Sequence, residues 1–179
     1  MNLEEYIWAI KHNRVAKDKF FKESPQSPIP FEERENFEGL NYYEPNPKYM
    51  FNLELEEFEN KEHIQLEDSV GNIRDYLRWG RFVFEVDGVE CILHAYKTDA
   101  SEERLFVPFK DATSGKETYG PGRYIDLIES EDKDGDKWFL DFNLATNPWC
   151  AYSHDYACPL IPFENILKVK IEAGEKSYK

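Results

Sequence analysis

The chain has 179 residues, a formal net charge of −14 and an aromatic content of 16%. Nucleic-acid binding requires a basic surface, so this charge balance argues against a nucleic-acid partner and against anionic membrane surfaces. No apolar run reaches the roughly 18 residues that a membrane helix needs, and we expect no membrane association. The many aromatic residues favour pleated, half-buried strands.

The N-terminus and the cysteines lead to an expectation about the cellular compartment. Residues 1–5 are acidic and lack the basic start and apolar stretch of a secretion signal. The three cysteines, Cys91, Cys150 and Cys158, are too few for a disulfide scaffold. We therefore expect a cytoplasmic protein with free thiols.

One long helix is predicted near the N-terminus, from Leu3 to about Lys22. Apolar residues recur there at three- and four-residue steps, and Asn2 is placed to cap the first turn. A proline-rich stretch beginning at Ser24 ends the helix, because proline supplies no helical N–H group. We interpret residues 1–179 as one domain with three parts, namely the helix 1–23, a proline-rich connection 24–39 and a β domain 40–179.

Short apolar and alternating runs predict strands from Leu40 onward. The clearest is a hairpin of Arg81–Val86 and Val89–Tyr96, because the intervening Asp87-Gly88 favours a turn with positive φ. Further strands are predicted at 49–55, 64–66, 105–107, 124–128, 138–142 and 166–171. The fold class is therefore mainly β, with the N-terminal helix followed by a single antiparallel β-barrel or sandwich of about eight strands.

The densest polar sequence lies in three segments of the second half, 108–124, 141–152 and 158–165. Loops on a rigid scaffold are common places for binding residues. Glycines in the first segment permit backbone that offers N–H groups to an anion, and Arg123 adds a bidentate donor. Asp141 and Asn143 are two residues apart, so on a strand they share one face.

This clustering predicts a module that binds a small polar or anionic molecule in a loop-lined pocket. The candidate ligand-binding residues are Asp111, Thr113, Tyr119, Arg123, Tyr124, Asp141, Asn143 and Asn147. The same residues also permit a structural interpretation, in which Arg123 pairs with Asp111 or Asp141 inside the fold and the tyrosines pack. The protein would then have a structural or interaction role without a ligand.

Cys150 and Cys158 are separated by seven residues that include His154. Four interpretations stay open, namely packed thiols, a disulfide, a catalytic nucleophile and metal ligands. A nucleophilic cysteine needs a neighbouring base, and a zinc site here would lack the usual short spacing and a fourth ligand. A hydrolase that uses Asp111 or Asp141 as general base, or Cys150 as nucleophile, is the alternative function.

No cofactor or metal site is predicted, because two short look-alike motifs lack required residues. Ser114–Glu117 echoes a phosphate-binding loop without its first glycine and without its closing Ser or Thr. Asp132–Asp136 has the acidic spacing of a calcium loop, but Lys137 occupies the required glycine position. The second motif is better interpreted as a solvated hairpin turn.

Several ordered blocks resemble the domain-of-unknown-function 1684 family. They are Phe106-Val107-Pro108-Phe109-Lys110-Asp111-Ala112-Thr113-Ser114-Gly115, Thr118-Tyr119, Gly122-Arg123-Tyr124, Asp141-Phe142-Asn143-Leu144-Ala145, Asn147-Pro148-Trp149-Cys150-Ala151-Tyr152, Cys158-Pro159, Asn165-Ile166-Leu167 and Ala173-Gly174-Glu175. Phe20-Phe21, Ser27-Pro28 and Phe37-Glu38-Gly39-Leu40 fit the N-terminal part of that family. The resemblance covers nearly the whole chain. It implies the fold of that family and no particular reaction.

Overall fold

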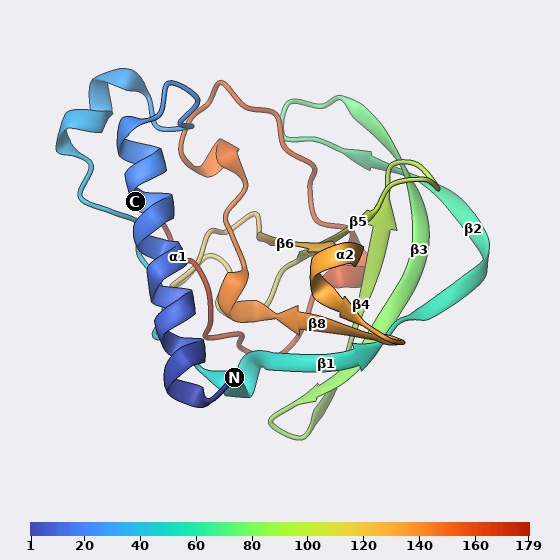
Figure 1. Ribbon diagram of the computed structural model, residues 1–179. Helices are drawn as coiled ribbons and strands as arrows, with labels where there is room; N and C mark the ends of the chain where they lie inside the picture. Colours follow the sequence, from blue (N-terminus) through green and yellow to red (C-terminus); the bar gives the residue numbers. More distant parts are fainter.

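A computed structural model describes residues 1–179 as a mainly β protein with an N-terminal helix, α1 (Leu3–Glu23), and two antiparallel sheets (Figure 1). The strands are β1 (Met50–Glu54), β2 (Glu56–Glu67), β3 (Ile73–Val86), β4 (Val89–Lys97), β5 (Arg104–Phe109), β6 (Arg123–Ile128), β7 (Lys133–Asp134) and β8 (Lys137–Asp141). One sheet has the order β2-β3-β4-β5-β6 and the other β1-β8-β7. They do not close into a barrel, so the predicted β fold is confirmed in its sandwich-like form.

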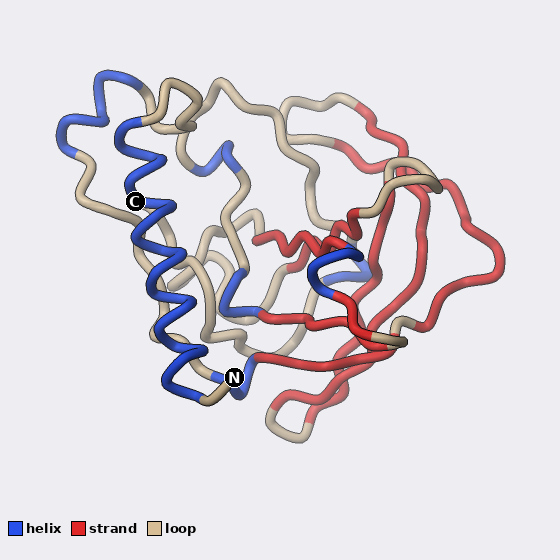
Figure 2. The backbone as a smooth tube through the Cα atoms, in the orientation of Figure 1, coloured by secondary structure: helices blue, strands red, loops and turns tan.

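Short helices punctuate the connections between strands. They are α2 (Glu129–Asp132) and the 3-10 turns Phe31–Asn36, Pro47–Tyr49, Phe142–Leu144, Trp149–Ala151 and Phe163–Asn165. Figure 2 shows how much of the backbone is loop rather than helix or strand. These loops carry most of the polar residues that the sequence singled out.

Helix α1 begins and ends where its sequence signals predict. Asn2 Oδ1 accepts a hydrogen bond from the Glu5 N–H at 2.9 Å, and Glu5 Oε2 accepts one from the Asn2 N–H at 3.0 Å, which is a complete capping box. Ile10 and Phe21 are its buried residues. The helix lies beside the loops that follow β8, and it brings polar side chains of its own to them (Figure 1).

The predicted hairpin is the β3–β4 pair, and its turn has the expected backbone. Asp87 has φ 50° and Gly88 has φ 80°, and this two-residue turn lets Val86 pair with Val89. Farther along, the register shifts between Arg78 and Gly80. Such a bulge adds one residue to a strand and changes the face on which side chains emerge.

Because of the bulge, even-numbered side chains of β3 lie on opposite faces of the five-stranded sheet before and after it. Beyond it, Phe82 and Phe84 point into the central core between the two sheets, where they meet Leu140 of β8. Before it, Tyr76 lies on the opposite face and packs against Tyr96. The polar loop segment 158–165 covers that outer face. Both sides of the large sheet are therefore occupied.

The strand predicted for Ile166–Ile171 is wrong. This segment makes only an isolated bridge, between Ile166 and Lys110, because its partners lie in a loop. The Leu167 N–H donates to the Lys110 carbonyl at 2.8 Å, and the Ile171 N–H donates to the Asp111 carboxylate at 2.7 Å. A side chain thus takes the place of a backbone ladder partner, and no strand propagates.

Candidate functional site

Arg123, the first residue of β6, has no exposed surface. Its Nη2 donates to the Asp111 carboxylate at 3.4 Å, and burial lowers the pKa of Arg123 while Asp111 opposes that shift. The remaining bonds of its Nη atoms go to the carbonyls of Ile171, Ala173 and Glu175. Only Nε has no partner. Arg123 therefore fastens the C-terminal segment to the sheet.

The Asp111 carboxylate also accepts hydrogen bonds from within the chain. Its Oδ2 accepts from the Thr113 hydroxyl at 2.8 Å and from the Ile171 N–H at 2.7 Å. Thr113 in turn lies 2.9 Å from the Thr118 hydroxyl, and all these side chains are buried. The predicted loop residues do converge here, but on one another.

Asp141 and Asn143 form a second closed network with the N-terminal helix. Asp141 accepts from the Tyr6 hydroxyl at 2.8 Å and from the Asn143 side chain at 2.9 Å. Asn143 also bonds both backbone groups of Asn46, at 2.9 Å and 2.8 Å. Burial, together with the Asp141 hydrogen bond, raises the pKa of Tyr6. Tyr6 was not identified from the sequence, because it lies within an ordinary helical pattern.

Asn147 belongs to a third network around Glu175, a buried carboxylate that was not among the candidates. Glu175 accepts from the Asn147 N–H and from the Tyr152 hydroxyl, both at 2.6 Å, and pairs with Lys17 at 3.2 Å. Only 1% of Glu175 is exposed. Its sole sequence signal is its place in the last of the family-like blocks.

The remaining candidates lie near the two cysteines. The Tyr124 hydroxyl donates to the Pro159 carbonyl, and the Tyr119 hydroxyl lies 3.7 Å from Cys150 Sγ. The Cys150 N–H donates to Cys158 Sγ at 3.4 Å, and both cysteines are free thiols. This pair is separate from the three polar networks.

The eight candidates therefore do not line one open pocket, and that part of the site prediction is corrected. Burying a charge is costly unless it is paired or hydrogen-bonded, and the charged groups Asp111, Arg123 and Asp141 bind neighbouring side chains or the backbone. These three residues fit the structural interpretation that the sequence left open, in which the charged groups are satisfied inside the fold. Two of the eight also border cavities, and these are separate from each other: Asn143 borders one beside α1 and Tyr119 borders another beside the C-terminal residues.

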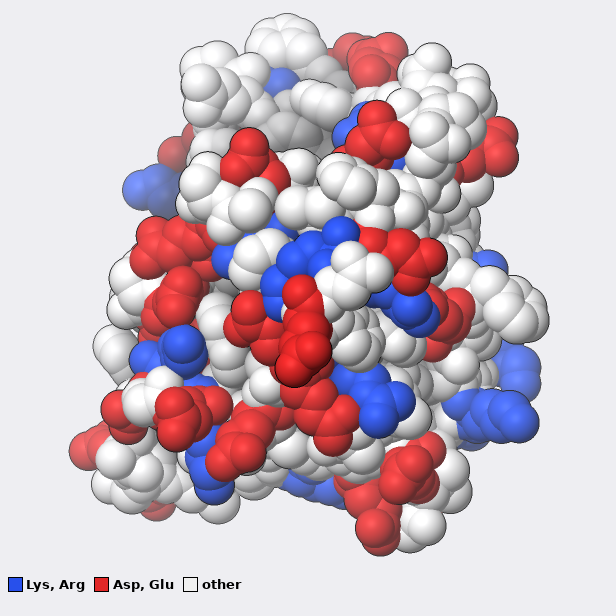
Figure 3. Space-filling view, turned by 90° about the vertical axis from the view of Figure 1, so that its right-hand side faces the viewer, with Lys and Arg blue, Asp and Glu red and all other residues white.

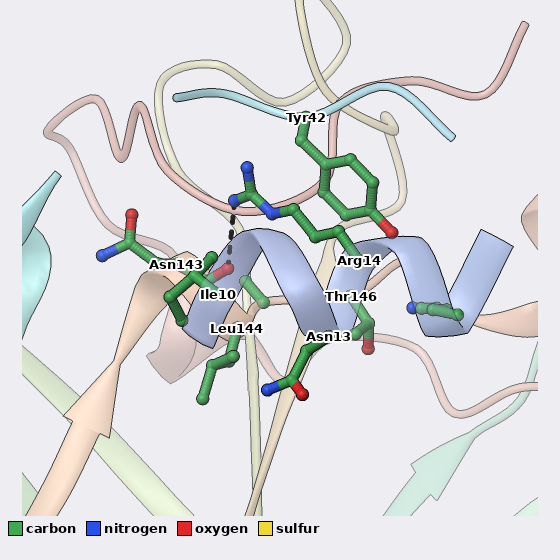
Figure 4. A pocket seen from close by; sticks show the side chains of 9 residues that line it. Ile10, Asn13, Arg14, Tyr42, Asn143, Leu144 and Thr146 are labelled. Carbon is green, nitrogen blue, oxygen red and sulfur yellow. Dashed lines mark hydrogen bonds between the residues drawn. The ribbon is translucent and has the colours of Figure 1, made fainter. Parts of the chain in front are cut away.

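The cavity that Asn143 borders lies between α1 and the 143–146 loop, and its volume is about 80 Å³ (Figure 4). The side chain of Arg14 crosses this cavity. Its guanidinium donates to the carbonyls of Tyr43 at 2.7 Å and Asn143 at 3.4 Å. The same group lies 4.4 Å from the centre of the Tyr42 ring. Arg14 Nε and the Tyr42 hydroxyl have no partner in the chain. The space suits a few water molecules or a small ion.

A larger cavity, with a volume of about 410 Å³, lies between the two sheets away from α1, and we call it the mouth cavity. Trp79, at the β3 bulge, lies on the inner face of its sheet, against the central core. Lys97, the last residue of β4, is 8% exposed, and its Nζ lies 4.2 Å from the centre of the Trp79 ring. No carboxylate lies within 4.0 Å of this ammonium.

The opposite wall of the mouth cavity comes from the small sheet. Trp138 of β8 is buried, and Lys133 of β7 lies over its ring while pairing with Glu129 at 3.0 Å. Carboxylates complete the lining, from Glu54, Glu57, Glu129 and Asp136. Figure 3, which looks onto the β2–β3 end of the molecule, shows acidic and basic side chains interspersed across that surface. Of the two lysines that line the cavity, Lys97 is thus the one without a carboxylate partner.

Sequence reasoning missed the mouth cavity because most of its residues lie in strands. Trp79 and Lys97 fit an ordinary strand pattern, and their proximity follows from the pairing of Leu77 with Lys97 across β3 and β4, which is not visible in the sequence. No group of three His, Cys, Asp or Glu side chains is arranged to hold a metal ion. None of the helices combines the length and hydrophobicity needed to cross a bilayer.

Comparisons with known proteins agree with the resemblance seen in the sequence. The solution NMR structure of an uncharacterized protein from gene locus rrnAC0354 of Haloarcula marismortui is 43% identical, with a TM-score of 0.73, over 97% of this chain and 95% of that chain. No curated protein matches. The family model described as "Protein of unknown function (DUF1684)" matches residues 35–176. The chain therefore belongs to the DUF1684 family.

Proposed function

We propose that the protein binds a small polar ligand with one anionic group in the mouth cavity. The observation that carries this proposal is the environment of Lys97, whose side chain is mostly covered and whose ammonium, beside the Trp79 ring, has no carboxylate within 4.0 Å. Burying a charge without a partner is costly, so a ligand anion is the natural complement. The volume of about 410 Å³ is within the usual range of about 300–1,000 Å³ for small-molecule sites.

The lining indicates the kind of molecule that fits. Lys97 provides a cation for one carboxylate, and Leu55, Trp79 and Trp138 provide the apolar part of the lining for the carbon skeleton of a ring. The carboxylates at the rim accept hydrogen bonds from hydroxyl groups and repel additional negative charge. A hydroxylated ring with a single carboxylate, as in a sugar acid, satisfies all three conditions.

The hydrolase alternative receives less support from the geometry. Asp111 and Asp141 accept hydrogen bonds from neighbouring residues and are buried, so neither is placed as a general base for a substrate. Binding without catalysis at the mouth cavity is therefore the better proposal. A cytoplasmic location is part of the same proposal, and it accords with three free thiols.

Thermal unfolding with chosen ligands tests the proposal. Glucuronate should stabilise the protein more than glucose or glucosamine, by about 2.7 kcal/mol when its concentration reaches about a hundred times Kd. Lys97→Met should abolish this stabilisation. Lys61→Met is the matched control, because Lys61 lies 4.3 Å from the centre of the same Trp79 ring but pairs with Glu57 at 2.8 Å.

Two results would overturn the proposal. One is equal glucuronate stabilisation in the Lys97→Met and Lys61→Met variants, which would place the ligand elsewhere. The other is a preference for glucosamine, since a cation would then be the recognised group.

A further inference from the structure

Cys150 and Cys158 are brought together by two loops that a third segment fixes in place. Cys150 lies in the 3-10 turn Trp149–Ala151, and its N–H donates to Cys158 Sγ at 3.4 Å. Cys158 is fixed by Ser69, whose N–H donates to the Cys158 carbonyl at 2.9 Å and whose hydroxyl accepts from the Cys158 N–H at 3.1 Å. The pair is thus set by backbone as well as by side chains.

The two sulfur atoms differ in access and in charge. Cys150 is half-buried, whereas Cys158 is only 8% exposed. A hydrogen bond from the Cys158 thiol lowers the pKa of Cys150 to about 6, with further help from the hydroxyls of Tyr119 and Ser69. The pKa of Cys158 is raised, because Cys150 beside it takes the negative charge. The lowered pKa of Cys150 favours the thiolate at the more accessible sulfur, and the raised pKa of Cys158 favours the thiol at the covered one.

The surroundings of the pair favour this division of roles. The Tyr119 hydroxyl lies 3.7 Å from Cys150 Sγ and stabilises a thiolate there. The other polar groups facing the pair are Tyr124 and Arg74. No third cysteine interferes, since the Cys91 thiol donates to the carbonyl of Val89 in the separate β3–β4 hairpin.

We propose that Cys150 and Cys158 form a hydroperoxide-reactive dithiol that closes to a disulfide. In the first step the Cys150 thiolate attacks the hydroperoxide. An S–O bond forms and the O–O bond breaks, so sulfur is oxidised to the sulfenic acid while the leaving oxygen is reduced and takes a proton as an alcohol or water. In the second step Cys158 loses its proton and attacks the Cys150 sulfur, and hydroxide leaves as water.

The pair has the arrangement that this sequence of steps requires. A peroxide-reactive thiol needs low pKa, access and an adjacent resolving thiol, and Cys150 has all three. The site takes hydroperoxides as a class and is distinct from the mouth cavity. It explains the thiol pair without requiring a metal or a hydrolytic reaction.

Mass spectrometry after treatment with one equivalent of hydrogen peroxide tests the proposal on the full, reduced chain. We expect loss of two hydrogens, a peptide link between Cys150 and Cys158, and an unmodified Cys91. Cys158→Ser should trap a sulfenic acid at Cys150 that dimedone labels, and Cys150→Ser should not react at this dose. Equal peroxide consumption by wild type and Cys150→Ser, or links only between chains, would overturn the proposal.

A pH profile on the wild-type chain tests the same proposal without relying on a variant that fails to fold. Alkylation of Cys150 by iodoacetamide should rise about twofold between pH 6 and pH 8, because a thiol with a pKa of about 6 is already half ionised at the lower value. A thiol with the ordinary pKa of 9.0 would accelerate about ninetyfold over this interval. A rise of that size would contradict the assignment.

Tyr119→Phe examines the positioning role of the tyrosine hydroxyl. The variant should move the midpoint of the Cys150 alkylation profile to higher pH, while peroxide still links the two cysteines. A merely structural role would leave that midpoint unchanged. Val15→Ala, an exposed change on α1, is the control that should affect neither measurement.

Discussion

Two regions of the molecule are rich in polar groups, namely the mouth cavity and the networks around Arg123, Asp141 and Glu175. They differ in how many of these groups have a partner within the chain. In the networks nearly every donor and acceptor has a partner within the chain, and Arg123 has no exposed surface. In the mouth cavity the ammonium of Lys97 has only an indole beside it. The polar residues that are densest in the sequence hold the C-terminal segment in place, whereas Lys97, at the end of a strand, has no carboxylate partner.

The difference has a simple physical origin. Irregular loops expose backbone groups that must be satisfied when they are buried, so loop side chains such as Asp111 replace ladder partners. Strands satisfy their own backbone groups, which leaves side chains such as Lys97 available. Free polar groups are therefore better sought on strands beside a cavity than in polar loops.

The largest expected effect is that of Arg123→Ala on stability. Removing the guanidinium leaves the buried Asp111 carboxylate without its charge partner, and such a change costs about 3–5 kcal/mol. Urea unfolding measures it. Arg81→Ala is the control, because Arg81 makes an exposed pair with Glu56 and should cost less than about 1 kcal/mol. Similar unfolding midpoints for the two variants would contradict a structural role for Arg123.

Tyr6→Phe should have the next largest effect. The change removes the hydroxyl that bonds Asp141 and Asn143 and leaves those buried groups less satisfied, at a cost of about 1–3 kcal/mol. Tyr156→Phe is the matched control, because the Tyr156 ring packs against Trp149 without a hydroxyl hydrogen bond. Equal stability of both variants by urea unfolding would show that the helix contact contributes nothing.

A smaller effect is expected at Glu164, which is paired but only half-buried. Burial alone raises the pKa of Glu164, but hydrogen bonds from Tyr96 and Arg78 outweigh it and hold the pKa below its ordinary 4.5. A carboxylate with a depressed folded-state pKa stabilises the protein above about pH 4.5, and this stability is lost as the pH falls through the folded-state pKa.

Glu164→Gln should therefore flatten the pH dependence of the urea midpoint below about pH 4.5, by less than about 1 kcal/mol because solvent screens the group. Glu23→Gln at the end of α1 is the control. An unchanged slope in Glu164→Gln would show that the pair with Arg78 adds no stability.

The smallest stability effect is predicted for Lys97→Met. Replacing an ammonium that has no carboxylate partner by an apolar side chain of similar length should change the free energy of unfolding by less than about 1 kcal/mol, or raise it. Urea unfolding gives the value. A loss comparable to that of Arg123→Ala would mean that Lys97 is structural, and the contrast between the two regions would disappear.

Local patterns were sufficient to predict much of the fold. The capping residues of α1 and the Asp87-Gly88 turn act within a few residues, and both were predicted correctly. The segment Ile166–Ile171 has a strand-like pattern, but its partners lie in a loop that no local rule identifies. Its strand was predicted wrongly for that reason.

The site was harder to predict, because its determinants are distant in sequence. The partners of Glu175 come from α1 and from the loop after β8, and none of these contacts leaves a local pattern. Trp79 reaches the mouth cavity through the pairing of β3 with β4, which sets Leu77 opposite Lys97. The polar loops were expected to meet around an open pocket, but their buried groups bond within three separate networks, which the sequence could not show.

The most direct measurement uses the indole N–H signals of the four tryptophans in a two-dimensional NMR titration with glucuronate. Trp79 and Trp138 line the mouth cavity, whereas Trp8 is exposed on α1 and Trp149 lies beside the cysteine pair. We predict that the Trp79 and Trp138 signals shift together and saturate, while the other two stay in place. Shifts confined to Trp8 or Trp149, or no shift at ligand concentrations that stabilise the fold, would contradict ligand binding between the two sheets.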